Sequence, residues 1–330
     1  MAALAVVFLF RDTDPIHAVY KLVFEEKTLS DLTVILAATW LTSVVLLLFN
    51  HHIYRLLEGY MWPLRRRAWI DRQREKHDDL TGYLLATYPQ IFPLPGTATD
   101  EVKSEYFRRR QEFNTLFPYK RDLVLATRFG NAIRSFEAYP DKVYGADSIP
   151  IWLRLQALIP KDFTAAIGDA RVQVDFYLNI LVLAVLIGSA ALVRLAINLY
   201  VIIRCGNNAI DMLSYCSQHD WGRVGFRWDL LIWIVASFAL ARLCYELAIH
   251  RAISWGGLVK SAFDLYLPDL AKQLCYSLPA TNARRQEFWS AVNSQFLYAV
   301  AVPDEWPRIA PEGAAVQAAA DAEPDDDDTG

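Results

Sequence analysis

Two long apolar stretches constrain this chain more than any other feature of its sequence. Residues 32–49 contain no charged side chain, and residues 176–203 contain only one, Arg194. The hydrocarbon core of a bilayer is about 30 Å thick, and a helix needs about 20 mainly apolar residues to cross it. Both stretches are close to that length or exceed it. They predict an integral membrane protein.

A third apolar stretch, residues 226–249, carries charges only near its ends. Asp229 lies at its start, and Arg242 and Glu246 lie toward its end. Charged side chains near the end of a membrane helix can reach the interface, so we expect a third span here. Tryptophans crowd its start, as they do at membrane interfaces. The alternative is a buried helix in a soluble domain.

Helical periodicity dominates the rest of the chain, and no pair of strands is evident. We therefore predict an all-α integral membrane protein with three transmembrane helices and a helical cytoplasmic region. The predicted segments are an N-terminal segment outside the cell (1–31), transmembrane helix 1 (32–53), the helical cytoplasmic region (54–175), transmembrane helix 2 (176–203), a connecting loop (204–225), transmembrane helix 3 (226–249), cytoplasmic helices (250–300) and a disordered acidic tail (301–330).

The charge of the chain is unevenly distributed. The formal net charge is −4, but residues 301–330 contain nine acidic residues and one arginine, so the remainder is slightly basic. So small an excess of positive charge does not indicate that the chain binds nucleic acid. Contact with anionic lipids of a bilayer accounts for it. The tail has the composition of a segment that cannot form a core, which predicts disorder.

The basic residues also predict an orientation. Arg55 and Arg65–Arg67 follow the first apolar stretch, whereas residues 1–31 hold more acidic than basic side chains. Because basic residues favour the cytoplasmic side, we expect residues 54–175 and the C-terminus to be cytoplasmic and the N-terminus to be outside. The expected location is the inner (plasma) membrane.

Signals for catalysis, a cofactor or a metal are weak in this sequence. No C-x-x-C pair is present, and no nucleophile-elbow, zinc-protease or phosphate-loop motif occurs. We therefore predict no cofactor and no metal site. Cys205 and Cys216 both lie in the predicted connecting loop and can form a disulfide if that loop faces an oxidising compartment; two free thiols are the alternative.

Polar and aromatic residues recur between residues 128 and 154. An arginine there, Arg128 or Arg154, can pair with Asp147 and hold a turn against a helix. One interpretation is a structural polar network, and the other is a docking surface for a cytoplasmic protein. The candidates are Arg128, Asn131, Tyr144, Asp147, Trp152 and Arg154.

Three of the charged residues in the predicted spans are candidates for a functional role. Arg242 and Glu246 are four residues apart, so they can pair on one helix face. Arg194 lies in the second span. Ionisable groups in a membrane are candidates for transport or conduction. The alternative is that these side chains extend to the interface.

Several motifs resemble a family of uncharacterised bacterial integral membrane proteins. They are the R-F-G-N sequence at 128–131, the Y-G-x-D sequence at 144–147 and the G-L-V-x-x-A-F-D-L sequence at 257–265. The resemblance extends over most of residues 30–275 and implies bacterial origin and a membrane topology, but no activity. Tyr266, Leu267 and Pro268 follow the last motif where the family pattern has a His-Arg pair.

These features favour a non-enzymatic function. We expect a membrane-anchored scaffold or sensor that presents its helical region to a cytoplasmic protein partner. The first alternative is a channel-like or transporter-like homo-oligomer that uses Arg194, Arg242 and Glu246. The second is a membrane-bound enzyme, for which the sequence shows no paired acid and base.

Overall fold

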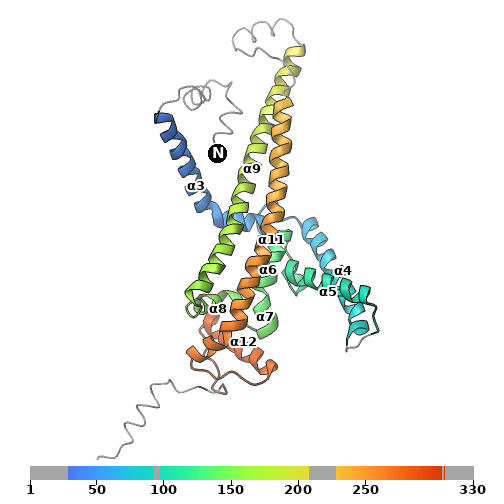
Figure 1. Ribbon diagram of the computed structural model, residues 1–330, viewed down its shortest axis with the longest axis vertical. Helices are drawn as coiled ribbons and strands as arrows, with labels where there is room; N and C mark the ends of the chain where they lie inside the picture. Colours follow the sequence, from blue (N-terminus) through green and yellow to red (C-terminus); the bar gives the residue numbers. More distant parts are fainter. Residues whose placement is uncertain (1–28, 93–96, 208–227, 307, 309–330) are drawn as a thin grey trace, which may run out of the picture. The chain divides into compact units, whose positions relative to one another are not determined.

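The computed structural model describes residues 29–92, 97–207, 228–306 and 308 (Figure 1). Over these residues every regular element is a helix, and one isolated β-bridge joins Tyr276 to Arg308. The prediction of an all-α chain is therefore confirmed. Three helices are long and apolar enough to cross a membrane. They are α3 (Leu29–Leu57), α9 (Lys161–Asn207) and α11 (Trp228–Gln273).

The chain divides into two compact units. The first combines the described residues up to Leu56 with Val172–Arg251, and it holds the apolar parts of α3, α9 and α11. The second combines Leu57–Arg171 with the described residues from Ala252 onward. The second unit contains the short helices and the candidate site.

In the first unit, α9 and α11 lie antiparallel (Figure 1). Ala191 and Leu230 are fully buried in one cluster between them. A Cβ atom placed on Gly188 would lie only 3.2 Å from the Ser237 Cβ atom. Small residues thus allow the two helices to approach closely, a feature common between membrane helices.

Helix α3 joins this unit through a polar contact at its C-terminal end. The Tyr54 hydroxyl donates a 2.7 Å hydrogen bond to the Asp175 carboxylate, and the Asn50 amide lies 3.4 Å from the same oxygen. Asp175 directly precedes the second predicted span. This contact ties the end of α3 to the beginning of the apolar part of α9.

Large apolar side chains cover the outside of the first unit. Trp40, Leu47 and Leu48 on α3 are 69%, 77% and 70% exposed, and Ile232 and Val235 on α11 are similarly open. A soluble monomer seldom exposes a continuous apolar surface of this kind. The surface has the character of one that faces lipid.

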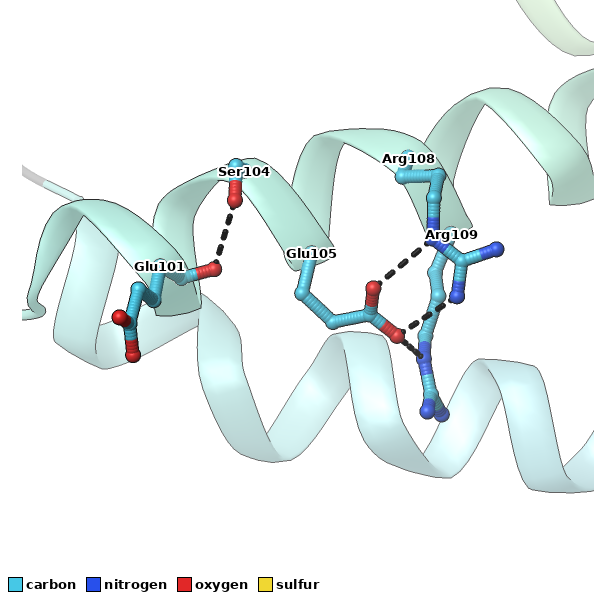
Figure 2. A network of polar contacts seen from close by, with 5 residues as sticks. All are labelled: Glu101, Ser104, Glu105, Arg108 and Arg109. Carbon is cyan, nitrogen blue, oxygen red and sulfur yellow. Dashed lines mark hydrogen bonds and ion pairs between the residues drawn. The ribbon is translucent and has the colours of Figure 1, made fainter.

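The second unit begins with a hairpin of α4 (Arg67–Ile91) and α5 (Asp100–Leu116). Thr99, followed by Asp100 and Glu101, has the sequence of a helix N-cap, and it caps α5 by accepting a hydrogen bond from the Val102 amide. Glu105 pairs with both Arg108 and Arg109 on α5, and Arg109 reaches the neighbouring helix α4, where its guanidinium lies 4.1 Å from the Tyr83 ring centroid (Figure 2). The hairpin core consists of Leu84, Ile91, Tyr106, Phe113 and Phe117.

Helix α6 (Arg128–Glu137) follows a short 3-10 turn, η1 (Arg121–Leu123). Phe129, Ile133 and Phe136 recur at helical spacing, so the sequence predicts one helix over residues 121–139; its predicted start is wrong. The chain is extended before Arg128 because Thr127 caps α6, accepting from the Gly130 amide at 3.0 Å and donating to the Leu57 carbonyl at 2.6 Å. Gly130 is required there, since a Cβ atom would lie 2.2 Å from the Glu58 carbonyl oxygen.

Three further helices complete the second unit: α7 (Tyr139–Tyr144), α8 (Ser148–Leu155) and α12 (Asn282–Tyr298). Phe288 and Trp289 of α12 are fully buried. Trp306 is buried as well, and its ring centroid lies 5.6 Å from that of Phe288. The packed chain therefore extends to Trp306, inside the segment predicted to be a disordered tail.

Other predictions concern residues outside the described part of the chain. These include residues 1–28 of the predicted N-terminal segment, the greater part of the connecting loop and residues 309–330 of the tail. The Cys205 side chain and all of Cys216 also lie outside it. The disulfide therefore stays a prediction.

Candidate functional site: an apolar cavity in the helical unit

A cavity of about 450 Å³ opens in the second unit between α6, α8, the first turns of α9 and the middle of α11. This volume lies within the range of small-molecule sites in proteins. Apolar and aromatic side chains form most of the wall. The principal ones are Phe136, Trp152, Ile159, Ile167, Trp255, Val259 and Phe263.

Contacts between aromatic rings hold the walls of the cavity in place. The rings of Phe136 and Trp255 meet edge to face with centroids 5.1 Å apart, and those of Trp152 and Phe263 are 5.8 Å apart. Gly256 permits the first contact, because a Cβ atom there would lie 2.4 Å from Phe136 Cδ1. Helices α6 and α8 are thereby both fixed against α11.

The polar part of the cavity centres on Glu137. Its carboxylate accepts a 3.0 Å hydrogen bond from Arg134 on the same helix. Burial raises the pKa of Glu137, the nearby Asp147 carboxylate raises it further, and Arg134 opposes both effects. Arg171 lines the cavity from α9. The cavity thus combines an apolar body with an acid and a base at its polar part.

Helix α8 borders the cavity with two exposed apolar side chains. Ile149 is 66% exposed and Leu153 is 71% exposed, and both belong to the lining. Residues four apart lie on one helix face, so these side chains make an apolar border. An apolar ligand can reach the cavity without crossing a charged surface on α8.

The six predicted site residues separate into different roles. Trp152 lines the cavity. Asn131 is fully buried and holds the chain before α6, since its amide accepts from the Leu125 amide nitrogen at 2.7 Å and donates to the Leu125 carbonyl at 3.2 Å. Arg128 is half-buried at the first position of α6.

Of the two arginines predicted as partners of Asp147, Arg154 has a different partner, and the Asp147 carboxylate also binds elsewhere. The Asp147 carboxylate caps α8 by accepting from the Ile149 amide at 3.1 Å. Arg154 donates to the Pro150 carbonyl at 2.7 Å, and its guanidinium lies 3.6 Å from the centroid of the Phe296 ring. Capping and stacking satisfy these groups locally.

Tyr144 faces α11. Its hydroxyl donates to the Asp264 carboxylate at 2.8 Å, and the Tyr139 hydroxyl donates to the same carboxylate at 2.9 Å. Asn293 of α12 secures the following turn, accepting from the Asp147 amide nitrogen and donating to the Gly145 carbonyl. The sequence pattern missed Tyr139, Asp264 and Asn293 as partners because no local spacing connects them to residues 144–147.

The charged residues selected from the candidate spans occupy two levels of the first unit. Arg242 and Glu246 form the expected ion pair on α11. Arg194 is only 3% exposed on α9. Gly188 lies opposite Ser237, and the two helices are antiparallel, so Arg194 lies opposite a residue about eleven positions before Arg242. At 1.5 Å per residue, Arg194 and Arg242 are about 16 Å apart along the helix axes. Within one chain they do not converge on a single site.

Among the described residues, no group of three or more His, Cys, Asp or Glu side chains is arranged to hold a metal ion. No protein-family model, curated protein or solved structure matches the chain. The resemblance to a family of bacterial membrane proteins therefore stays a prediction. The cavity and the charged surface of the second unit are therefore the features that bear on function.

Proposed function

We propose that this chain is a membrane-anchored sensor that binds an apolar or amphipathic small molecule in the cavity of its second unit. The observation that supports this function is the cavity of about 450 Å³, with aromatic walls and a half-buried carboxyl group. Ligand sites typically have mostly apolar walls and a small number of polar groups that point toward the ligand. The bound state would be presented to a cytoplasmic protein partner.

The helices that form the cavity suggest where its ligand comes from. Thr164, Ile167 and Gly168 belong to α9, and Trp255 and Phe263 belong to α11. Both helices are also candidates to cross a membrane. A molecule that partitions into the bilayer is therefore the ligand class that we propose.

The polar groups must supply selectivity for such a ligand. Burial of each CH₂ group taken from water contributes about 0.8 kcal/mol. A molecule taken from the bilayer gains almost none of this, because hydrocarbon is as apolar as the cavity wall. Discrimination among membrane-soluble molecules then rests on the head group that meets Glu137 and Arg171.

A variant that fills the cavity tests this function. A Cβ atom added at Gly168, which lines the cavity, has no atom within 4 Å, and the same is true of a Cβ atom added at Gly257, outside the cavity. Gly168→Leu and Gly257→Leu therefore make a matched pair, each replacing a helical glycine without a clash at the Cβ atom. The full chain in amphipol is titrated with a dansyl-labelled fatty acid, and energy transfer from tryptophan reports binding.

The expected result is saturable binding that Gly168→Leu weakens about tenfold, since excluding two buried CH₂ groups costs about 1.6 kcal/mol. Gly257→Leu should bind like the unaltered chain. An unlabelled fatty acid should compete. Equal affinities for all three proteins, or a signal that never saturates, would contradict a ligand site in the cavity.

We further propose that the second unit lies in the cytoplasm of a bacterial cell. The cluster Arg65–Arg67 follows the first apolar helix, and basic residues next to a span favour the cytoplasmic side. A single cysteine introduced at Lys103, whose side chain is about one-third exposed, tests the orientation in a background with the native cysteines replaced. It should react with an impermeant maleimide only after the spheroplast membrane is broken; labelling of intact spheroplasts would reverse the orientation.

An oligomeric channel remains the second candidate, supported by the burial of Arg194 within a helix that can span a membrane. Reconstituted into liposomes, such a channel would conduct ions, and Glu246→Gln would reduce the flux by releasing Arg242. An absence of flux at protein densities that give fatty-acid binding would remove this candidate.

A further inference from the structure

A second, smaller pocket of about 180 Å³ lies on another side of the second unit. Residues of α5, α6, α7 and α11 line it. Three of its lining side chains are cationic, and none is a carboxylate. The lining consists of Arg110, Phe113, Asn114, Phe117, Tyr119, Ser135, Ala138, Tyr139, Lys142, Val143 and Lys260.

The three cations come from different helices. Arg110 belongs to α5, Lys142 to α7 and Lys260 to α11. Lys260 donates a 3.0 Å hydrogen bond to the Asn114 carbonyl, which keeps its ammonium at the pocket. Within the described ranges, no carboxylate lies within 4.0 Å of a charged nitrogen of any of the three. Packing thus brings together like charges that repel each other.

Arg110 differs from the two arginines that precede it. Glu105 binds Arg108 and Arg109 through its two carboxylate oxygens (Figure 2). Arg110 is absent from that network and lines the pocket instead. The third arginine of the run is therefore available to a ligand.

Two carboxylates border the pocket, and both have other partners. The Tyr119 hydroxyl and Lys120 contact Asp141. The hydroxyls of Tyr139 and Tyr144 contact Asp264. Both carboxylates accept hydrogen bonds from tyrosine hydroxyls, and neither belongs to the pocket lining, so cations remain in excess there. Desolvation and the neighbouring Arg110 lower the pKa of Lys142, as expected where cations gather without a counter-ion.

We propose that this basic pocket, defined by Arg110, Lys142 and Lys260, binds a phosphate group. A phosphate monoester carries a charge of about −1.5 to −2 at pH 7, which matches three converging cations better than a single carboxylate does. Two sources share this chemistry: the head group of an anionic lipid, and a free phosphate compound. The proposal is independent of the apolar cavity.

The test uses the full chain in nanodiscs and two pairs of matched variants. Lys260→Gln and Lys272→Gln each remove one charge from α11, and Lys272, which pairs with Asp269, is absent from the lining. Arg110→Gln and Arg108→Gln do the same on α5. The first arm titrates inorganic phosphate into phosphatidylcholine nanodiscs by calorimetry. The second measures phosphatidic acid bound to the protein by native mass spectrometry.

Loss of one charged hydrogen-bond donor should weaken binding about tenfold, so Lys260→Gln and Arg110→Gln should each do so. Lys272→Gln and Arg108→Gln should bind normally. Saturable binding of inorganic phosphate would indicate a free phosphate ligand, and retention of phosphatidic acid alone would indicate a lipid head group. Absence of binding in both arms, or equal losses in the control variants, would overturn the proposal. Lys142→Gln provides a further variant if Lys260→Gln misfolds.

Discussion

The Tyr144 hydroxyl lies 2.8 Å from a carboxylate oxygen of Asp264, although 120 residues separate the two in the chain. Tyr139 binds the same carboxylate, and the two tyrosine rings meet edge to face. Because both tyrosines belong to α7 and Asp264 belongs to α11, this contact fixes the short helix against the long one. The basic pocket lies on this junction, since Tyr139 also lines it.

We predict that the Tyr144→Phe substitution destabilises the protein by about 1 kcal/mol, the usual net value of a partly exposed hydrogen bond. Denaturant unfolding of the full chain in detergent, followed by tryptophan fluorescence, measures this. Tyr298→Phe is the control, because Tyr298 is largely exposed. An equal effect at both positions would contradict a specific role for the Asp264 contact.

The same junction predicts a dependence on alkaline pH. Burial, assisted by the Asp264 carboxylate, raises the pKa of Tyr139 from 10.0 to about 12. A raised folded-state pKa stabilises the fold below the unfolded value and ceases to do so as pH rises through the folded value. The free energy of unfolding should therefore fall between pH 10 and 12. Tyr139→Phe should flatten that fall; an unchanged slope would argue against the contact.

Asp147 distinguishes a structural role from a docking role. Its carboxylate caps α8, so Asp147→Ala should cost about 1 kcal/mol of stability, whereas Asp147→Ser should retain most of it. The two variants are compared by the same unfolding measurement. If both are as stable as the unaltered chain but fail to capture a cytoplasmic partner, the docking interpretation is correct instead.

Glu137 predicts how pH affects the cavity. The pKa of its carboxyl is raised first by burial, and the charged groups near it are Arg134, Asp147 and Arg171. Fatty-acid affinity should increase as pH falls through that pKa, because the cavity loses a charge. Glu137→Gln should make the affinity less dependent on pH, with Glu287→Gln as an exposed control. An unchanged pH profile in Glu137→Gln would assign the titration to another group.

Glu105 predicts an effect at acid pH. Hydrogen bonds from Arg108 and then Arg109 lower its pKa from 4.5 to about 2. A lowered acid pKa stabilises the fold above the unfolded value, and this stabilisation is lost as pH falls from 4.5 toward 2. Salt should weaken the effect, since the group is exposed. Glu105→Gln should reduce the acid sensitivity of unfolding more than Glu101→Gln does.

Local patterns predicted much of the fold. Hydropathy predicted the three long helices, and the capping sequence at Thr99 predicted the start of α5. Both signals are local because span length and end capping depend on neighbouring residues. The start of α6 was mispredicted, since the close approach of Gly130 to Glu58 depends on a segment far away in the chain.

Local sequence patterns predict much less of the candidate sites than of the fold. The sequence indicates Trp152, which does line the cavity, but it indicates neither the contact of Trp152 with Phe263 nor the half-buried Glu137. Asp147 was selected for an ion pair and instead caps a helix. Polar residue type showed that these positions matter, without showing what they contact.

The three candidate membrane spans and the helical class follow from composition and periodicity, because the length and hydropathy of a helix depend only on its own residues. The cavity, the Tyr144–Asp264 junction and the meeting of Arg110, Lys142 and Lys260 depend on how α5, α6, α7, α8, α9 and α11 pack. No short segment encodes those distances. They exist only when burial of apolar faces such as Phe136 and Phe263 brings distant helices together.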